Sequence, residues 1–400
     1  MLAVIETHPV QYHAPVYRAL PQQFGVPVTA IYGSDFSVAG YRDREFGTSF
    51  AWDTDLLSGY SSLFLSRVAG GGARTFDEVS ARGLREHLRR LSPSAVMILG
   101  YSPRFHREAW HEARRLGQPI LFRGETSDDA HSRGWLKSGL RRAALGLAYR
   151  SCDRLLYIGV RSREHFERLG VPADRLVFSP YCVDTTPFEM DESARERLRP
   201  QARHELGISD DRLVVLYSGK LSERKGVDVL VRALRALPAS LRERTTLLVV
   251  GDGEQRATLE AIASESPALS AIFAGFQNQT RLSRFYHAAD LFVLPSRHSE
   301  TWGLVVNEAL HHGLPCVVSD RVGCAPDLIR SGVTGRVCDA GSVAALAAAI
   351  ESVVPLVGRA SVRADCRDLV ARYTVNEAAR GIAEAFRSAV SDQRVAEKVS

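Results

Sequence analysis

Short apolar runs alternate with longer amphipathic stretches along most of the chain, and the apolar runs end in glycine, proline or polar residues. Such runs are typical of strands buried in a parallel sheet, and the stretches between them are typical of the helices that cover it. The pattern therefore predicts an α/β protein. The runs that we interpret as strands are residues 2–5, 26–32, 95–99, 120–122, 154–158, 176–178, 213–217, 247–250, 272–273, 291–294 and 316–318.

A charged segment rich in arginine and glutamate interrupts this alternation at residues 191–205. We expect it to be a helical linker, because the strand and helix pattern restarts after it, at Leu213. A chain of 400 residues is also too long for one ordinary hydrophobic core. The sequence thus predicts two doubly wound parallel-sheet domains, residues 1–190 and 191–372, followed by a last helical segment at residues 373–400.

The composition is that of a globular protein, with 45% apolar and 24% charged residues. A formal net charge of +5 is small for this length and does not favour nucleic acid as a partner. The 6 cysteines stand singly, without the paired spacing of a metal site, which predicts reduced thiols in a cytoplasmic protein. No stretch resembles a secretory leader or a membrane span, so we expect a soluble or peripheral protein.

A strand, a polar loop and a helix follow one another between Leu291 and Gly313. Two carboxylates bracket this joint, Glu300 in the loop and Glu308 further on, inside the helix. The first amides of a helix have no partner within it, so those of residues 302–305 can receive an anionic phosphate. Carboxylates accept hydrogen bonds from sugar and ribose hydroxyls. The joint therefore predicts a binding site for a sugar nucleotide.

Glu300 and Glu308, with seven residues between them, resemble the paired-glutamate motif of retaining glycosyltransferases of the family 4 type, also called glycosyltransferase group 1. The surrounding sequence agrees, with Pro-Ser before the pair and Gly-Leu-Pro after it. The resemblance implies the GT-B fold, in which two Rossmann-like domains face each other across a cleft. It also implies that the first domain lies on the acceptor side, that the second binds the donor, and that the last helix crosses back to the first.

The same resemblance implies a hexosyltransferase that moves a sugar from a nucleotide-diphosphate donor to the hydroxyl of a glycan, a lipid-linked glycan or a small metabolite. It implies retention of anomeric configuration without a metal or other cofactor, and it favours UDP or GDP as the donor nucleotide. Two alternatives stay open, a sugar-nucleotide epimerase of related architecture and a non-catalytic sugar-nucleotide binding protein. A dehydrogenase is disfavoured, because no predicted strand leads into Gly-x-Gly-x-x-Gly. The sequence does not indicate an oligomeric state.

The segment from Gly219 to Gly226 resembles the phosphate-binding segment of that family. Its Lys220 and Lys225 would neutralise the departing diphosphate, and Glu300 would hold donor sugar hydroxyls, so we expect these three residues to be catalytic. The side chain of Phe276 would lie beside the nucleobase, and Glu308 would bind the ribose hydroxyls. The expected donor-binding residues are Gly219, Phe276, Thr301, Trp302, Gly303, Leu304, Val305 and Glu308.

The loops after the strands of the first domain lie at the carboxyl edge of its sheet, where doubly wound folds bind ligands. The long loop-rich region at residues 35–72 would lie over this acceptor side. In the alternative interpretation, the first-loop residues cap or support a helix, and Arg123 pairs with Glu125. A dedicated general base, if one exists, would be Glu125 or His8; otherwise the leaving phosphate takes the acceptor proton. The acceptor-side candidates are His8, Gln11, Tyr12, His13, Tyr101, Arg123 and Glu125.

Residues 133–150 are basic and amphipathic. Such a helix can rest on an anionic membrane, which would place the protein at the inner face of the membrane. The alternative is a solvated basic face above an apolar stripe that packs on the domain.

Overall fold

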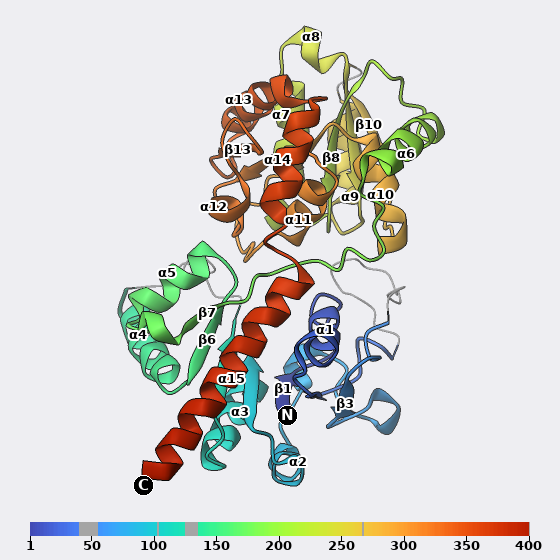
Figure 1. The fold of residues 1–400 in the computed structure, drawn as a ribbon. Helices are drawn as coiled ribbons and strands as arrows, with labels where there is room; N and C mark the ends of the chain where they lie inside the picture. The colour runs from blue at the N-terminus through green and yellow to red at the C-terminus, as the bar shows by residue number, and fades with distance from the viewer. Residues whose placement is uncertain (40–54, 102–103, 125–134, 266–267, 400) are drawn as a thin grey trace.

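The computed structural model describes residues 1–39, 55–101, 104–124, 135–265 and 268–399. They form two parallel β-sheets, each flanked by helices and connected by extended segments, with one sheet above the other in Figure 1. Strand–helix alternation gives each half its own buried core. The predicted fold class, two doubly wound parallel-sheet domains, is confirmed.

The first sheet has 7 strands in the order β3-β2-β1-β4-β5-β6-β7, and its pairings are parallel. Successive side chains of a strand point to opposite faces, so Leu2 and Val4 face the core beneath one set of helices, and Ala3 and Ile5 face the other set. The strands are β1 (Leu2–Glu6), β2 (Val28–Tyr32), β3 (Ser61–Phe64), β4 (Ala95–Leu99), β5 (Ile120–Arg123), β6 (Arg154–Tyr157) and β7 (Leu176–Phe178). The helices are α1 (Ala14–Phe24), α2 (Leu84–Leu91), α3 (Arg104–Arg115), α4 (Trp135–Arg150), α5 (Val160–Arg168) and the last helix of the chain, α15 (Val375–Val399).

The second sheet has 6 strands in the order β10-β9-β8-β11-β12-β13, again with parallel pairings. Its central strands are apolar and fully buried, as expected for a sheet covered on both faces. The strands are β8 (Leu213–Ser218), β9 (Thr245–Val250), β10 (Ser270–Phe273), β11 (Leu291–Leu294), β12 (Cys316–Ser319) and β13 (Gly335–Cys338). The helices are α6 (Glu192–Glu205), α7 (Val227–Arg235), α8 (Ala239–Arg242), α9 (Arg256–Ser264), α10 (Gln279–Ala288), α11 (Leu304–His311), α12 (Ala325–Leu328), α13 (Val343–Val353) and α14 (Ala360–Val370).

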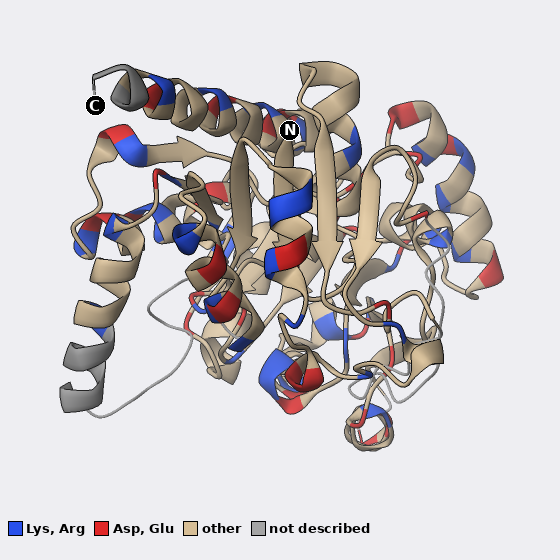
Figure 2. Ribbon diagram, turned by 90° about the horizontal axis from the view of Figure 1, so that it is seen from below, with Lys and Arg blue, Asp and Glu red and all other residues tan. Residues whose placement is uncertain are grey.

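Charged residues of both signs are interspersed along the helices, whereas the strands carry few of them (Figure 2). This distribution follows from burial, because an unpaired charge inside a sheet covered on both faces would lose its hydration. The exceptions are therefore informative, and two of them, Glu6 and Arg123, lie at the carboxyl ends of β1 and β5.

The charged segment that we predicted to be a linker is helix α6, which packs against α10 of the second domain. Arg203 of α6 is 1% exposed and donates to the carboxylate of Asp290 at 2.7 Å. Arg199 donates to the other oxygen of the same carboxylate at 2.6 Å. The segment is helical, as predicted, but it packs on the second domain through the buried Arg203 and the half-buried Arg199 and is not a free linker.

Two of the four edge strands, β3 and β13, were not predicted. Ser61–Phe64 is half-exposed, and in Gly335–Cys338 the two middle residues are exposed, so neither forms an apolar run. An edge strand has one neighbour only and tolerates polar residues, which removes the signal that identified the central strands.

Helix α15 leaves the second domain and runs along the first sheet beside α1 (Figure 1). Its apolar face joins the core of the first domain through Ala378, Ile382 and Ala385. Arg154 of β6 donates to Ser388 Oγ at 3.1 Å. The last helix is therefore part of the first domain's packing although it follows the second domain in the chain.

Close approach of α15 to β7 requires a residue without a side chain at Gly381, because a Cβ there would lie 1.9 Å from the carbonyl oxygen of Phe178. We expect Gly381→Ala to destabilise the protein by roughly 1–3 kcal/mol, since overpacking outweighs the gain in helix propensity. Urea unfolding measures this change. Ser391→Ala, at an exposed position of the same helix, is the control and should change stability by less than about 0.5 kcal/mol.

Among the described residues, no single helix combines the length and apolar composition of a membrane span. The stretches Val343–Leu356 and Ala360–Val395 meet that test only when they are taken together, across a bend of 112°.

Candidate active site

Residues from both domains line a small cavity of about 100 Å³. The loops after β8, β9 and β10 contribute Gly219, Gly251 and Phe276, and helix α11 contributes Glu308 and Val305. The first domain contributes Gln11 and Tyr12 from the loop after β1. The carboxyl ends of parallel strands are where doubly wound folds bind ligands. Because Gly219, Phe276, Val305 and Glu308 were predicted to bind the donor, we call this cavity the donor pocket.

Glu308 is the buried carboxylate of the donor pocket. It is 3% exposed, and Tyr286 Oη donates to its Oε2 at 2.7 Å. Burial raises the pKa of Glu308 to about 7, and the hydrogen bond from Tyr286 opposes that rise. The ring of His312 stacks on Tyr286 at a centroid distance of 4.7 Å, which fixes the phenol. The side chain of Glu308 is thus held in one position. With a pKa of about 7, its carboxyl group changes between the protonated and the charged form near neutral pH.

Lys225 and Glu300, two of the predicted catalytic residues, form an ion pair although 75 positions separate them in the chain. Their side chains are only 12% and 11% exposed. Ser296 donates to the same carboxylate oxygen of Glu300 at 2.9 Å. The segment that carries Lys225 packs closely on the loop after β11 at Gly226. A Cβ at this glycine would lie 2.5 Å from the carbonyl oxygen of Pro295.

The start of helix α11 supplies the predicted free amides. Gly303 has φ +100, and a Cβ there would lie 3.0 Å from side-chain atoms of Leu294 and Val322, so glycine is required. In the described part of the chain, the amides of Gly303, Leu304 and Val305 donate to no backbone carbonyl. Of these predicted residues, Val305 lines the donor pocket.

The side chain of Trp302 is buried between the two domains rather than exposed to a ligand. It is 2% exposed, its Nε1 donates to Asn307 Oδ1 at 2.8 Å, and its ring packs against Tyr181 and Tyr373. A Cβ at Gly159 of the first domain would lie 2.4 Å from this ring. Any contribution of Trp302 to donor binding is therefore limited to its backbone.

Lys220 and Thr301 are both half-buried and lie outside the set of residues that line the donor pocket. The carbonyl oxygen of Lys220 accepts a hydrogen bond from Tyr217 Oη at 2.7 Å, which fixes the loop after β8. The structure thus places Lys225 in direct contact with Glu300.

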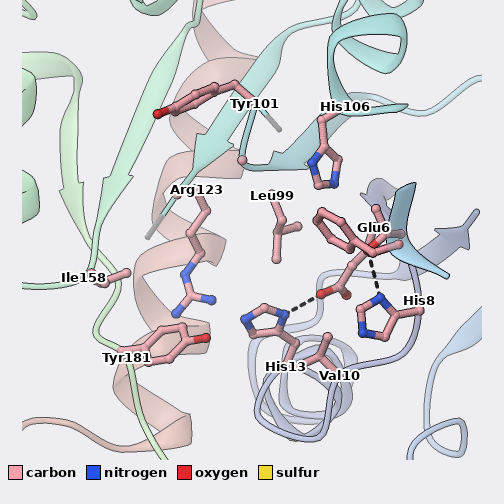
Figure 3. A pocket seen from close by; sticks show the side chains of 14 residues that line it. Glu6, His8, Val10, His13, Leu99, Tyr101, His106, Arg123, Ile158 and Tyr181 are labelled. Carbon is pink, nitrogen blue, oxygen red and sulfur yellow. Dashed lines mark hydrogen bonds and ion pairs between the residues drawn. The ribbon is translucent and has the colours of Figure 1, made fainter. Parts of the chain in front are cut away.

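A second cavity, of about 350 Å³, lies at the carboxyl edge of the first sheet, and we call it the acceptor pocket. Four of the predicted acceptor-side residues line it, namely His8, His13, Tyr101 and Arg123 (Figure 3). Gln11 and Tyr12 line the donor pocket instead, and Glu125 lies outside the described residues. Lining residues that the sequence did not indicate include Glu6, Phe76, His106 and Tyr181.

Glu6 and His13 form a buried pair in the acceptor pocket, with His13 Nδ1 2.5 Å from Glu6 Oε1. Tyr17 Oη donates to the other carboxylate oxygen at 3.0 Å. Glu6 ends the apolar strand β1, and an acid at the end of a buried strand is a signal that could have identified it. The ring of His8 lies 4.5 Å from that of Phe36, tilted by 30°. Burial lowers the pKa of His8 to about 4, so its ring is neutral at pH 7.

Arg133 of the basic segment 133–150 lies outside the described residues, and helix α4 covers Trp135–Arg150. Leu147 of this helix is 69% exposed. Contact of this segment with a membrane, and a cytoplasmic location, stay predictions. In the described ranges, no group of three or more His, Cys, Asp or Glu side chains is arranged to hold a metal ion.

Two doubly wound parallel sheets, with a pocket built from both halves at their carboxyl edges, define the GT-B architecture. Solved structures share this fold over nearly the whole chain. WaaG, a glycosyltransferase involved in lipopolysaccharide biosynthesis, superposes over 96% of this chain and 99% of its own, with a TM-score of 0.66 and 18% identity. Anabaena Alr3699/HepE in complex with UDP and glucose superposes over 97% and 99%, with a TM-score of 0.67 and 17% identity.

The model of the family described as glycosyl transferases group 1 matches residues 199–356 of this chain. A GDP-mannose-dependent alpha-(1-6)-phosphatidylinositol monomannoside mannosyltransferase of Mycolicibacterium smegmatis is 33% identical over 60% of this chain and 62% of its own length. A D-inositol 3-phosphate glycosyltransferase of Acidothermus cellulolyticus is 32% identical over 62% of this chain and 55% of its own length. The chain thus spans less than two thirds of these relatives.

Proposed function

We propose that the protein is a retaining glycosyltransferase that moves a sugar from a nucleotide-diphosphate donor to an acceptor hydroxyl without a metal ion. The observation that carries this proposal is the donor pocket, where a buried glutamate, glycine-rich strand ends and the start of a helix meet residues of the other domain. The relatives named as glycosyltransferases support it.

In this proposal, Glu308 accepts hydrogen bonds from the ribose hydroxyls, and Phe276 lies against the nucleobase. The amides of Leu304 and Val305 receive the diphosphate, because the positive end of the helix dipole favours an anion there. Lys225 lies beside Glu300, so its charge is available where the leaving diphosphate and the donor sugar meet. This cation would replace the metal ion that other transferases use to neutralise the leaving group.

The acceptor hydroxyl would enter from the acceptor pocket, on the first-domain side of the donor pocket. Neutral His8 can accept a hydrogen bond there, and the leaving phosphate can take the acceptor proton. We also keep the division of the chain as part of the proposal, with residues 1–190 and 373–400 on the acceptor side and residues 191–372 on the donor side. The packing of α15 on the first sheet supports this division.

UDP and GDP are the donor nucleotides that we propose. A neighbouring structure holds UDP and glucose, and one relative is named as GDP-mannose-dependent, so the comparisons support both bases.

We expect one nucleoside diphosphate out of UDP, GDP, ADP and TDP to raise the melting temperature of the full chain with and without magnesium. A ligand at 100 times its Kd stabilises a folded protein by about 2.7 kcal/mol, which a thermal-shift assay resolves easily. Sugar conjugates of the nucleoside diphosphate that raises the melting temperature most then serve as donors in a transfer assay. NMR of the product anomeric proton would test retention.

Four results would contradict parts of this proposal. Stabilisation that disappears with EDTA would overturn metal independence, and an inverted product anomer would overturn retention. Absence of stabilisation by any nucleotide would overturn the proposed donor pocket. An isomerised sugar nucleotide formed without an acceptor would favour the epimerase.

A further inference from the structure

Arg123 is a buried cation in the wall of the acceptor pocket. It ends strand β5, is 4% exposed, and lies over the ring of Tyr181 at 5.6 Å (Figure 3). Its Nη2 donates to the carbonyl oxygen of Pro180 at 3.0 Å. Its Nε is enclosed and donates to no described residue. The guanidinium is thus anchored at one end and has donor capacity left over.

No carboxylate among the described residues lies within ion-pair distance of Arg123. Glu6 is the only acid that lines the acceptor pocket in the described part of the chain, and both of its oxygens are engaged, by His13 and by Tyr17. A buried charge without a counter-ion is costly, because it loses hydration and gains no partner. Within the described part of the chain, the charge of Arg123 is thus left without a counter-ion, and an anionic group of a ligand in the acceptor pocket could supply one.

The rest of the acceptor pocket suits a small hydroxylated molecule. His8, His13 and Tyr101 offer ring nitrogens and a phenol that can hydrogen-bond to hydroxyl groups. The cavity of about 350 Å³ is at the small end of the range for ligand pockets. A guanidinium presents parallel N–H donors that match two oxygens of a phosphate, whereas neutral hydroxyls do not require such a group.

We propose that the acceptor carries a phosphate ester that binds Arg123, next to the hydroxyl that receives the sugar. This inference rests on the proposed function, and it adds the substrate class of the acceptor pocket. The phosphate can belong to a free polyol phosphate or to the headgroup of a lipid, and the chemistry at Arg123 is the same in both cases.

The first experiment measures binding by calorimetry. The full chain is saturated with the nucleoside diphosphate that stabilises it most, so that the donor pocket is filled, and is titrated with glycerol 3-phosphate and with glycerol. We expect glycerol 3-phosphate to bind at least about tenfold more tightly than glycerol, as a charge-assisted hydrogen bond allows. Equal affinity of the two would overturn the proposal without any variant.

Arg123→Gln should remove about tenfold or more of the affinity for glycerol 3-phosphate and leave nucleoside diphosphate binding unchanged. Arg154→Gln is the matched control, because Arg154 is also a largely buried arginine of the same sheet that bonds to backbone and side-chain oxygens. It should keep the affinity for both ligands. If Arg123→Gln does not fold, Arg123→Lys is used instead. Lysine keeps the positive charge but lacks the parallel N–H donors of the guanidinium, so it should lose part of the affinity for glycerol 3-phosphate. Unchanged affinity in a folded Arg123 variant would overturn the proposal.

Transfer assays distinguish the two sources of phosphate and separate this inference from the proposed function. Glycerol 3-phosphate in solution and phosphatidylglycerol in vesicles are offered as acceptors, with glycerol and phosphatidylcholine vesicles as the neutral counterparts. Preference for either anionic member supports the inference and identifies the source. Transfer or donor hydrolysis without any anionic preference would overturn the inference and leave the transferase standing. Loss of nucleotide binding itself would instead overturn the proposed function.

Discussion

Glu308→Gln is expected to weaken nucleoside diphosphate binding by about 10- to 100-fold at pH 8, because hydrogen bonds to a charged carboxylate are worth roughly 1.5–3 kcal/mol. The amide keeps the shape of the side chain and still accepts from Tyr286, so the change isolates the charge. Calorimetry with the nucleotide selected by the thermal-shift panel measures the loss. In the native protein, affinity should rise as the pH increases from 6 to 8, since the pKa of Glu308 is raised to about 7 and its anion is the better acceptor.

The same substitution should not cost stability. The pKa of Glu308 is about 7 in the folded protein and near the ordinary 4.5 in the unfolded chain, so the folded state binds the proton more tightly between these values. The native protein therefore loses stability as the pH rises from 4.5 to 7, by about 1.4 kcal/mol per pH unit from this group, or up to about 3 kcal/mol in all. The Glu308→Gln variant has no carboxyl group at this position, so its stability should not fall over this pH range for that reason. At pH 8 it should be at least as stable as the native protein in urea unfolding.

Glu112→Gln is the control for this behaviour. Hydrogen bonds from Arg85 lower the pKa of Glu112, so this group contributes stability above its ordinary pKa and loses it as the pH falls. The control should thus change the pH dependence in the opposite direction and leave nucleotide affinity intact. Full affinity in Glu308→Gln, or native affinity that does not vary from pH 6 to 8, would show that Glu308 does not bind the ribose.

The central part of the fold was predictable because burial on both faces leaves a one-dimensional signal. Strands β4 and β11 have the predicted bounds, and both are short runs of largely buried apolar residues. The edge strands β3 and β13 and helix α6 were missed or misinterpreted for a common reason. Their residues are polar, and only tertiary contacts, such as Arg203 with Asp290, give those polar residues a buried partner.

The candidate site was predictable where it lies on one continuous segment. Glu300 and Glu308 are found on the loop and helix that the sequence indicates, and the free amides precede Glu308 in the same helix. Contacts between distant segments were not predictable from local patterns. The pairing of Lys225 with Glu300, and the meeting of Tyr181 with Arg123, depend on how separate strand ends are brought together. Gln11 and Tyr12 illustrate the same limit, because a loop of the first domain reaches the pocket of the second.

Lys225→Ala is expected to slow sugar transfer by about 10²- to 10³-fold, which is the usual effect of removing one group that stabilises developing charge. The lysine charge acts most strongly when the diphosphate departs, so nucleoside diphosphate affinity should fall by less than about tenfold. Single-turnover rates with saturating donor, together with calorimetric Kd values, separate the two effects. Arg224→Ala removes the adjacent basic side chain of the same turn and is the matched control, with an expected rate close to that of the native protein.

The ion pair with Glu300 provides a second, independent readout. Lys225→Ala leaves the carboxylate of Glu300, which is 11% exposed, with the hydrogen bond from Ser296 but without the lysine charge, so the variant should also be less stable. Adding Glu300→Gln removes that stranded charge and should recover part of the stability without recovering the rate. The two rate effects should be non-additive, since both residues act on the same bond-breaking step. A Lys225→Ala protein with reduced stability and native turnover would instead show that the lysine only balances Glu300, and the leaving diphosphate would then need another cation.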